Sequence, residues 1–167
     1  MTEKITFSEL INAAIAAEDA AQKIYLAFKS NFLYRPDIAN FWQAMADDEN
    51  EHAQILSSIH GRVAVEDLAK PVDIQLAEKA YELQGLRVQE LIEPVHNLND
   101  AYEIAYDLES SEVNTIFNFL TIRFLSTEES YGIISSTIDR HLLRLADFTR
   151  SFGDAEQCKR VLVTTWV

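Results

Sequence analysis

The chain has 167 residues, a length that suits one domain with one well-buried core. Hydrophobic residues make up 48% of the chain, which argues against disorder, and only four glycines and three prolines interrupt it, which favours long helices. The formal net charge of −13 argues against nucleic acid and anionic membranes as partners, because an acidic surface repels phosphate groups. With one cysteine, Cys158, the chain offers neither an intrachain disulfide nor a thiolate metal site.

The amino-terminal segment and the hydropathy of the chain indicate where the protein works. The segment MTEKITFSEL lacks the apolar core of a signal peptide. No stretch reaches the apolar length that spans a membrane. We therefore expect a cytoplasmic protein.

Two long amphipathic helices are predicted in the first part of the chain. The first, at about 7–30, follows a capping box that Thr6 opens, and its apolar residues recur at the helical period. The second, at about 38–60, has Asp37 as its expected N-cap and keeps its apolar residues on one face.

A long crossover and a second helical hairpin are predicted in the rest of the chain. The crossover, 61–98, contains a helical stretch at about 73–91. A third long helix is expected at about 100–124, and a fourth at about 127–151 after a capping box that Ser126 opens. Two antiparallel hairpins, one long crossover and a short C-terminal extension predict an all-α, ferritin-like four-helix bundle that occupies the whole chain as one domain.

The two predicted hairpins match each other. Glu109 lies 91 positions after Glu18, and His141 lies 89 positions after His52, the same offset that superimposes the expected caps of the second and fourth helices. The agreement of caps and histidines indicates a common register, although two amphipathic hairpins can also agree by chance.

Acidic and imidazole side chains interrupt the apolar stripes of all four predicted helices. Glu18 and Glu109 lie among apolar neighbours, and His141 lies on the apolar stripe of the fourth helix. Glu49 and His52 are three positions apart and share a helix face. A buried, unpaired carboxylate is costly, so these side chains need partners. Carboxylate oxygen and imidazole nitrogen suit iron, manganese or zinc, so we expect the five residues to converge on metal.

Two other interpretations of these residues stay open. Glu49 and His52, taken alone, suit an exposed helix pair, and all five together suit a buried hydrogen-bonded network without metal. The neighbouring acids Asp47, Asp48 and Glu51 are expected on the solvent-exposed face of the second helix.

The pattern resembles the rubrerythrin branch of the ferritin-like superfamily over roughly residues 6–151. The motif residues that carry the resemblance are Glu18, Glu49-x-x-His52, Glu109-x-x-Glu112 and His141. The resemblance implies that these six residues hold two iron ions. It implies further that Glu18, Glu49 and Glu109 form the catalytic centre, with Glu49 as a bridging ligand. The activity that the resemblance implies is oxidation of ferrous iron or reduction of peroxide. The resemblance also implies a homodimer.

Two further positions take their interpretation from the resemblance. Glu112 stands where rubrerythrins carry an additional carboxylate that exchanges with a histidine, and it is open between a ligand and a solvated neighbour. Tyr25 stands where the family often has a tyrosine near the metals, and it is open between that role and core packing.

The chain departs from the family pattern in two respects. Ile138 occupies the position of the fourth helix's glutamate, and the adjacent Asp139 is expected to point about a quarter-turn away. One ion instead of two is therefore a second expectation. The chain also lacks the two Cys-x-x-Cys pairs of a rubredoxin domain, so electrons are expected from a separate donor protein.

Three functions follow from these observations. The first is a non-haem di-iron oxidoreductase of the peroxidase or ferroxidase type. The second is a non-catalytic bundle that binds one zinc, manganese or iron ion. The third is a bundle that works without metal as an interaction module. The apolar tail residues Val161, Leu162, Val163 and Trp166 are expected to help a homodimer form.

Overall fold

The computed structural model describes residues 4–152 of the chain. Within that range it leaves undescribed the side chains of Glu112, Val113, Ser135, Thr137, Ile138, Asp139, Leu142 and Thr149. The predicted C-terminal extension with its apolar tail lies outside the described residues.

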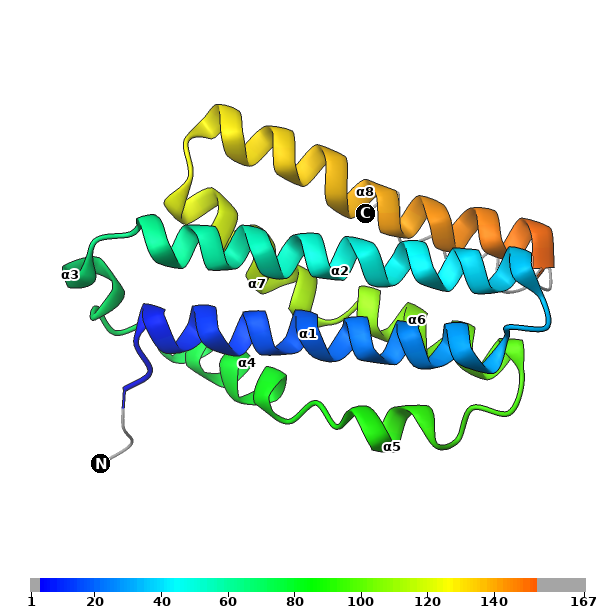
Figure 1. The fold of residues 1–167 in the computed structure, drawn as a ribbon. Coiled ribbons are helices and arrows are strands. Elements are labelled where there is room, and N and C mark those ends of the chain that lie inside the picture. Colours follow the sequence, from blue (N-terminus) through cyan, green and yellow to red (C-terminus); the bar gives the residue numbers. More distant parts are fainter. Residues whose placement is uncertain (1–3, 153–167) are drawn as a thin grey trace.

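The first hairpin consists of α1 (Phe7–Asn31) and α2 (Pro36–Arg62), which lie side by side and antiparallel (Figure 1). The predicted capping box before α1 is confirmed, because the Thr6 side chain accepts a hydrogen bond from the Glu9 backbone N–H and the Glu9 carboxylate accepts one from the Thr6 backbone N–H. The prediction that Asp37 is the N-cap of α2 is wrong. Arg35 is the N-cap, Pro36 follows it, and Asp37 lies in the first turn, 2.9 Å from the Arg35 guanidinium.

The crossover contains α3 (Val65–Leu68), α4 (Ile74–Gln84) and α5 (Val88–Ile92), and the last two run alongside α1 (Figure 1). The helix predicted at 73–91 is therefore two helices. The first of them ends at Gly85, a residue of low helix propensity, whose N–H bonds to the last turn of α4. Gly85 is thus a helix end that amphipathic periodicity alone does not reveal.

The second hairpin consists of α6 (Leu98–Glu109), α7 (Glu112–Phe124) and α8 (Thr127–Phe152). The helix predicted at 100–124 is interrupted, because Ser110 and Ser111 separate α6 from α7. The Ser111 hydroxyl donates to the Leu108 carbonyl at 2.6 Å and so competes with the helical hydrogen-bond pattern.

The turn into α8 has the predicted capping box. The Glu129 backbone N–H donates to the Ser126 hydroxyl, and the Glu129 carboxylate accepts from the Ser126 backbone, each at 3.2 Å. With α1, α2, the interrupted arm α6–α7 and α8, the fold is the expected all-α, ferritin-like bundle. Within residues 4–152, no helix combines the length and the apolar character that crossing a membrane requires.

The core of the bundle has two apolar clusters with a polar layer between them. One cluster contains Trp42, Tyr25 and Phe28, and the other contains Leu10, Leu56 and Phe117. The polar layer contains Glu18, Glu49, His52, Glu109 and His141, all buried. The helices therefore place ionisable groups midway along an otherwise apolar interior.

Truncating Phe28 should destabilise the bundle. The ring is 0% exposed and packs edge-on against Trp42 with centroids 5.1 Å apart, so Phe28→Ala should lower the free energy of unfolding by about 3–5 kcal/mol. Leu33→Ala, at a side chain that is 62% exposed, is the control and should change it by less than about 0.5 kcal/mol. Urea unfolding measures both, and equal losses in the two variants would contradict this account of the core.

Candidate metal centre

The five residues predicted to converge do converge, and they come from four different helices. Glu18 lies on α1, Glu49 and His52 lie on α2, Glu109 ends α6, and His141 lies on α8. Their exposed fractions are small: 0% for Glu18 and His52, 1% for His141, 3% for Glu49 and 7% for Glu109. An exposed Glu49–His52 pair, one of the open interpretations, is therefore wrong.

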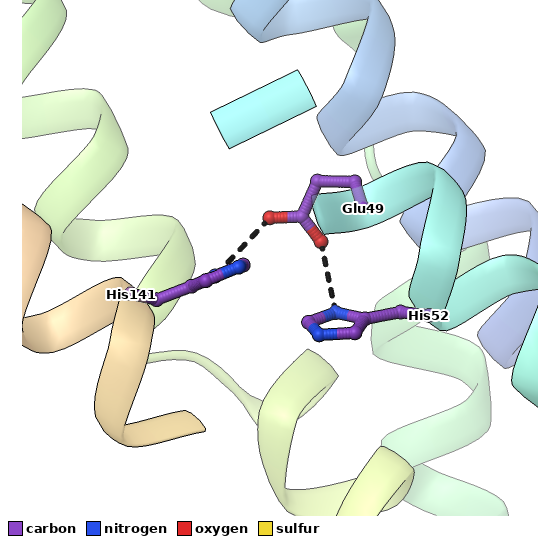
Figure 2. A group of neighbouring side chains, drawn as sticks. All are labelled: Glu49, His52 and His141. Carbon is purple, nitrogen blue, oxygen red and sulfur yellow. Dashed lines mark ion pairs between the residues drawn. The ribbon is translucent and has the colours of Figure 1, made fainter. Parts of the chain in front are cut away.

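Glu49 lies at the centre of the group, between the two histidines (Figure 2). One of its carboxylate oxygens, Oε2, is 3.3 Å from His52 Nδ1, and the other, Oε1, is 3.4 Å from His141 Nδ1. A single carboxylate thus faces both imidazoles, one with each oxygen.

Each histidine also faces a second carboxylate. His52 Nδ1 is 3.5 Å from Glu18 Oε2, and His141 Nδ1 is 2.8 Å from Glu109 Oε2. The group therefore divides into two halves, Glu18 with His52 and Glu109 with His141, which share Glu49.

Both halves contain buried polar atoms that form no hydrogen bond among the described residues, namely His141 Nε2 in one half and four atoms in the other. Among the described residues, nothing forms a hydrogen bond with either carboxylate oxygen of Glu18 or either ring nitrogen of His52. Such buried atoms are costly unless a partner satisfies them. Glu49, His52 and His141 also offer ligand atoms that all lie within 4.8 Å of one another. Carboxylate and imidazole donors at this spacing fit a divalent iron, manganese or zinc ion.

Asp48 belongs to this region, although it was predicted to lie on the exposed face with Asp47 and Glu51. Those two neighbours are exposed as expected, but Asp48 is 6% exposed because α8 covers it. Asp48 Oδ2 is 3.2 Å from His141 Nε2, the nitrogen that faces away from Glu49. Its carboxylate thus faces the outer nitrogen of the His141 ring as an ion-pair partner, without the geometry of a hydrogen bond.

Two arginines of α8 hold Asp48 in place. Arg140 Nη1 is 3.1 Å from Asp48 Oδ1, and Arg144 pairs with the other oxygen and donates to the Ala44 carbonyl at 2.9 Å. The sequence contained a sign that Asp48 is buried. Arg140 and Arg144 are one turn apart beside His141, and two arginines on a half-buried helix need an acidic partner.

Besides its contact with His141, Glu109 accepts hydrogen bonds from two further side chains. The Tyr25 hydroxyl donates to Oε1 at 2.6 Å, so this tyrosine contacts the centre as well as packing in the core. The Asn114 amide donates to Oε2 at 3.1 Å and to the Glu109 main-chain carbonyl at 2.8 Å. The sequence pattern did not reveal Asn114, because it reaches back to Glu109 across the break between α6 and α7.

Three predicted positions have no described side chain. Glu112 is the first residue of α7, and Ile138 and Asp139 lie within α8. Their side chains are outside the described part of the structure, so the additional ligand and the substituted glutamate stay predictions.

The Glu109–His141 pair is ionised at neutral pH when no cation is bound. Burial raises the pKa of Glu109, but the charge of His141 and the hydrogen bonds to the carboxylate outweigh it and set that pKa at about 2. Burial lowers the pKa of His141, but the charge of Glu109 and the contact with Asp48 outweigh it and raise that pKa to about 10.

The pKa values of Glu49, His52 and Tyr25 are all raised, through burial and the charges around them. Burial, followed by the charges of Glu109 and Glu18, raises the pKa of Glu49 well above its usual value. Burial lowers the pKa of His52, but the Glu18 carboxylate outweighs it, and the pKa rises. Burial and then Glu109 raise the pKa of Tyr25 well above 10, so its hydroxyl stays protonated as a donor. A bound cation would favour the ionised form of each carboxylate.

The ion pair predicts how stability depends on pH once a chelator has removed any metal. His141 stabilises the fold fully below pH 6.5, and this contribution disappears as the pH rises through about 10. Glu109 stabilises it above pH 4.5, and this contribution disappears as the pH falls towards about 2. Urea unfolding should therefore show stability falling between pH 6.5 and pH 10.

The control for this prediction is His96→Gln, at an exposed histidine, which should leave the pH profile unchanged. His141→Gln should flatten the decline above pH 6.5. A wild-type profile that is already flat there would show that the pair is not ionised as described.

Comparison with known proteins adds one finding to this geometry. The sequence model of the family described as Rubrerythrin matches residues 9–120, about two thirds of the chain. Glu18, Glu49, His52 and Glu109 lie inside the match, which ends before α8 and therefore before His141. No curated protein and no solved structure matches the chain significantly.

Proposed function

The chain belongs to the rubrerythrin family, and on that premise we propose that its buried glutamates and histidines hold two iron ions. The activity we propose is oxidation of ferrous iron or reduction of peroxide. The observation that carries the proposal is the position of Glu49, which faces both histidines with one oxygen each. A carboxylate in that position is suited to bridge two cations.

The two halves of the group would each hold one ion. Glu18 and His52 would serve one, Glu109 and His141 the other, and Glu49 both. Bound iron would supply one-electron exchange between its ferrous and ferric states and open positions for peroxide. The three carboxylates would favour the ferric state, because hard anionic oxygen ligands suit the higher charge.

Neighbouring residues hold these ligands in place. Tyr25 holds Glu109 by a hydrogen bond, and Asp48 faces the other nitrogen of His141 as an ion-pair partner. His141 gives up a proton before its Nδ1 binds a cation, so loading should release protons to the solvent. Burial of all five side chains keeps bulk water away from the reacting groups.

A non-catalytic site for one ion is the second candidate. The observation that favours it is that Glu49, His52 and His141 by themselves bring three ligand atoms within 4.8 Å of one another. One zinc, manganese or iron ion on these residues would have a structural or storage role. For the di-iron function, we further propose that the protein is a homodimer and that a separate protein donates its electrons.

Metal loading distinguishes these candidates. Anaerobic titration with ferrous ion should fill about two ions per chain, and added peroxide should oxidise them faster than free ferrous ion. Glu49→Gln removes the shared carboxylate at constant shape and should reduce both the stoichiometry and the oxidation rate. Glu51→Gln, at an exposed neighbour on α2, is the matched control.

Each outcome of this titration has a clear meaning. About one ion per chain with no acceleration of oxidation would favour the non-catalytic site. No bound ion, together with a melting temperature that chelation does not change, would favour a metal-free interaction module.

Replacing Asp48 should weaken metal binding without removing a ligand. Asp48→Asn breaks the contact with His141 Nε2, and loss of such a carboxylate partner typically lowers metal affinity by about 10–100-fold. Competition with a chelator of known affinity measures the change, and Asp47→Asn at the exposed neighbouring position is the control. Equal affinities in the two variants would show that Asp48 only packs α8 against α2.

A further inference from the structure

The interruption of the third arm lies directly beside the candidate metal centre. The helix α6 ends at Glu109, a proposed ligand, and α7 begins after Ser110 and Ser111. The other proposed ligands Glu18, Glu49 and His52 lie well inside unbroken helices, with several turns of backbone on either side. Among the five residues of the centre whose side chains are described, Glu109 is therefore the one at a helix break.

Exposure of the five side chains indicates the same side of the centre. The side chains of Glu49 at 4% and Glu109 at 3% retain some contact with solvent, whereas those of His52 at 1% and Glu18 at 0% retain almost none. Solvent thus approaches the centre from the side of Glu49 and Glu109.

A small cavity occupies that side. Its volume is about 10 Å³, and it is lined by Ala21, Glu49, Leu108, Glu109 and Asn114. A cavity of this size accommodates about one water molecule. It touches the shared carboxylate and the carboxylate at the break, so a molecule in it would contact two proposed ligands.

Four larger hollows in the described residues do not offer this access. Those of about 500, 410, 370 and 180 Å³ are lined by none of the five residues of the centre. The small cavity beside the break is the one among them that reaches the carboxylates.

Asn114 borders this cavity at the start of α7 and is half-buried. Its amide donates both to the Glu109 carboxylate and to the Glu109 main-chain carbonyl. The same side chain therefore narrows the cavity and fixes the nearest ligand.

We propose that small molecules of the size of water or peroxide reach the centre through the α6–α7 break, between Ala21 and Asn114. In this arrangement Asn114 is a positioning residue that holds Glu109 at the inner end of the route. The inference rests on the proposed function, since it concerns access to a bound metal.

Water exchange at bound manganese tests the route. Mn²⁺ is loaded into the protein, bound metal is measured, and the relaxation of water protons is compared at equal occupancy. Ala21→Val fills the cavity and should lower the relaxation enhancement by about half or more, because it excludes the one water that fits. Ala13→Val is the matched control, since both alanines lie on α1 and are 4% exposed, but Ala13 does not line the cavity.

Two variants of Asn114 separate its two roles. Asn114→Ala widens the route and should raise the relaxation enhancement above that of the wild type. Asn114→Leu keeps the bulk but loses both hydrogen bonds, so it should leave the enhancement unchanged and weaken Mn²⁺ binding. Unchanged affinity in Asn114→Leu would overturn the positioning role.

The outcomes distinguish this inference from the function on which it rests. If the wild type binds neither manganese nor iron, the proposed function fails and the route fails with it. If metal binds but Ala21→Val and Asn114→Ala both exchange water like the wild type, the route alone is overturned. Should Ala21→Val not fold, the rise expected for Asn114→Ala decides the question.

Unfolding without metal gives an independent check. Ala21→Val should destabilise the protein less than Ala13→Val, because the added methyl groups enter an existing cavity instead of a packed core. An equal or larger loss for Ala21→Val would show that the cavity offers no usable space.

Discussion

The structure depends on burying five ionisable side chains in the middle of an apolar bundle. Helices that are otherwise stabilised by apolar packing carry Glu18, Glu49 and Glu109 at one level, where an unpaired carboxylate costs several kcal/mol. Pairing with histidine offsets this cost only in part, because three carboxylates face two imidazoles. The raised pKa of Glu49 shows that the charge of this carboxylate is disfavoured without metal, and Glu18 lacks hydrogen bonds among the described residues. A cation is the natural partner because it would stabilise both carboxylates. Metal would then be a component of the fold as well as of the chemistry.

The two halves of the centre are similar in composition and different in support. In one half, Glu109 receives hydrogen bonds from Tyr25 and Asn114, and His141 has Asp48 at its second nitrogen. In the other half, the described residues provide no hydrogen bond to the carboxylate of Glu18. The internal match between the two hairpins therefore extends to Glu18 with Glu109 and to His52 with His141, but not to the residues that contact them. This support comes from three different helices, because Tyr25 lies on α1, Asp48 on α2 and Asn114 on α7.

The bundle and the convergence of its five polar residues could be predicted from the sequence, because helical periodicity and capping boxes are local. Three features could not. Glu109 and Ile116 are seven positions apart and share a face in a continuous helix, so the stripe gave no sign of the break at Ser110 and Ser111. Asp48 looked exposed because α2 alone does not reveal how α8 covers it. The hydrogen bond of Asn114 arises only because α7 starts anew after that break.

The position of α8 has a practical consequence for where this domain should be considered to end. The family match stops at residue 120, yet His141 and the two arginines that hold Asp48 lie beyond it. A protein cut at the matched boundary would retain four of the five ligands, lose one of its two imidazoles, and expose the carboxylate of Asp48 without its counter-ions. The smallest unit that could be expressed with these five side chains together therefore extends through α8, beyond the residues that the family model matches.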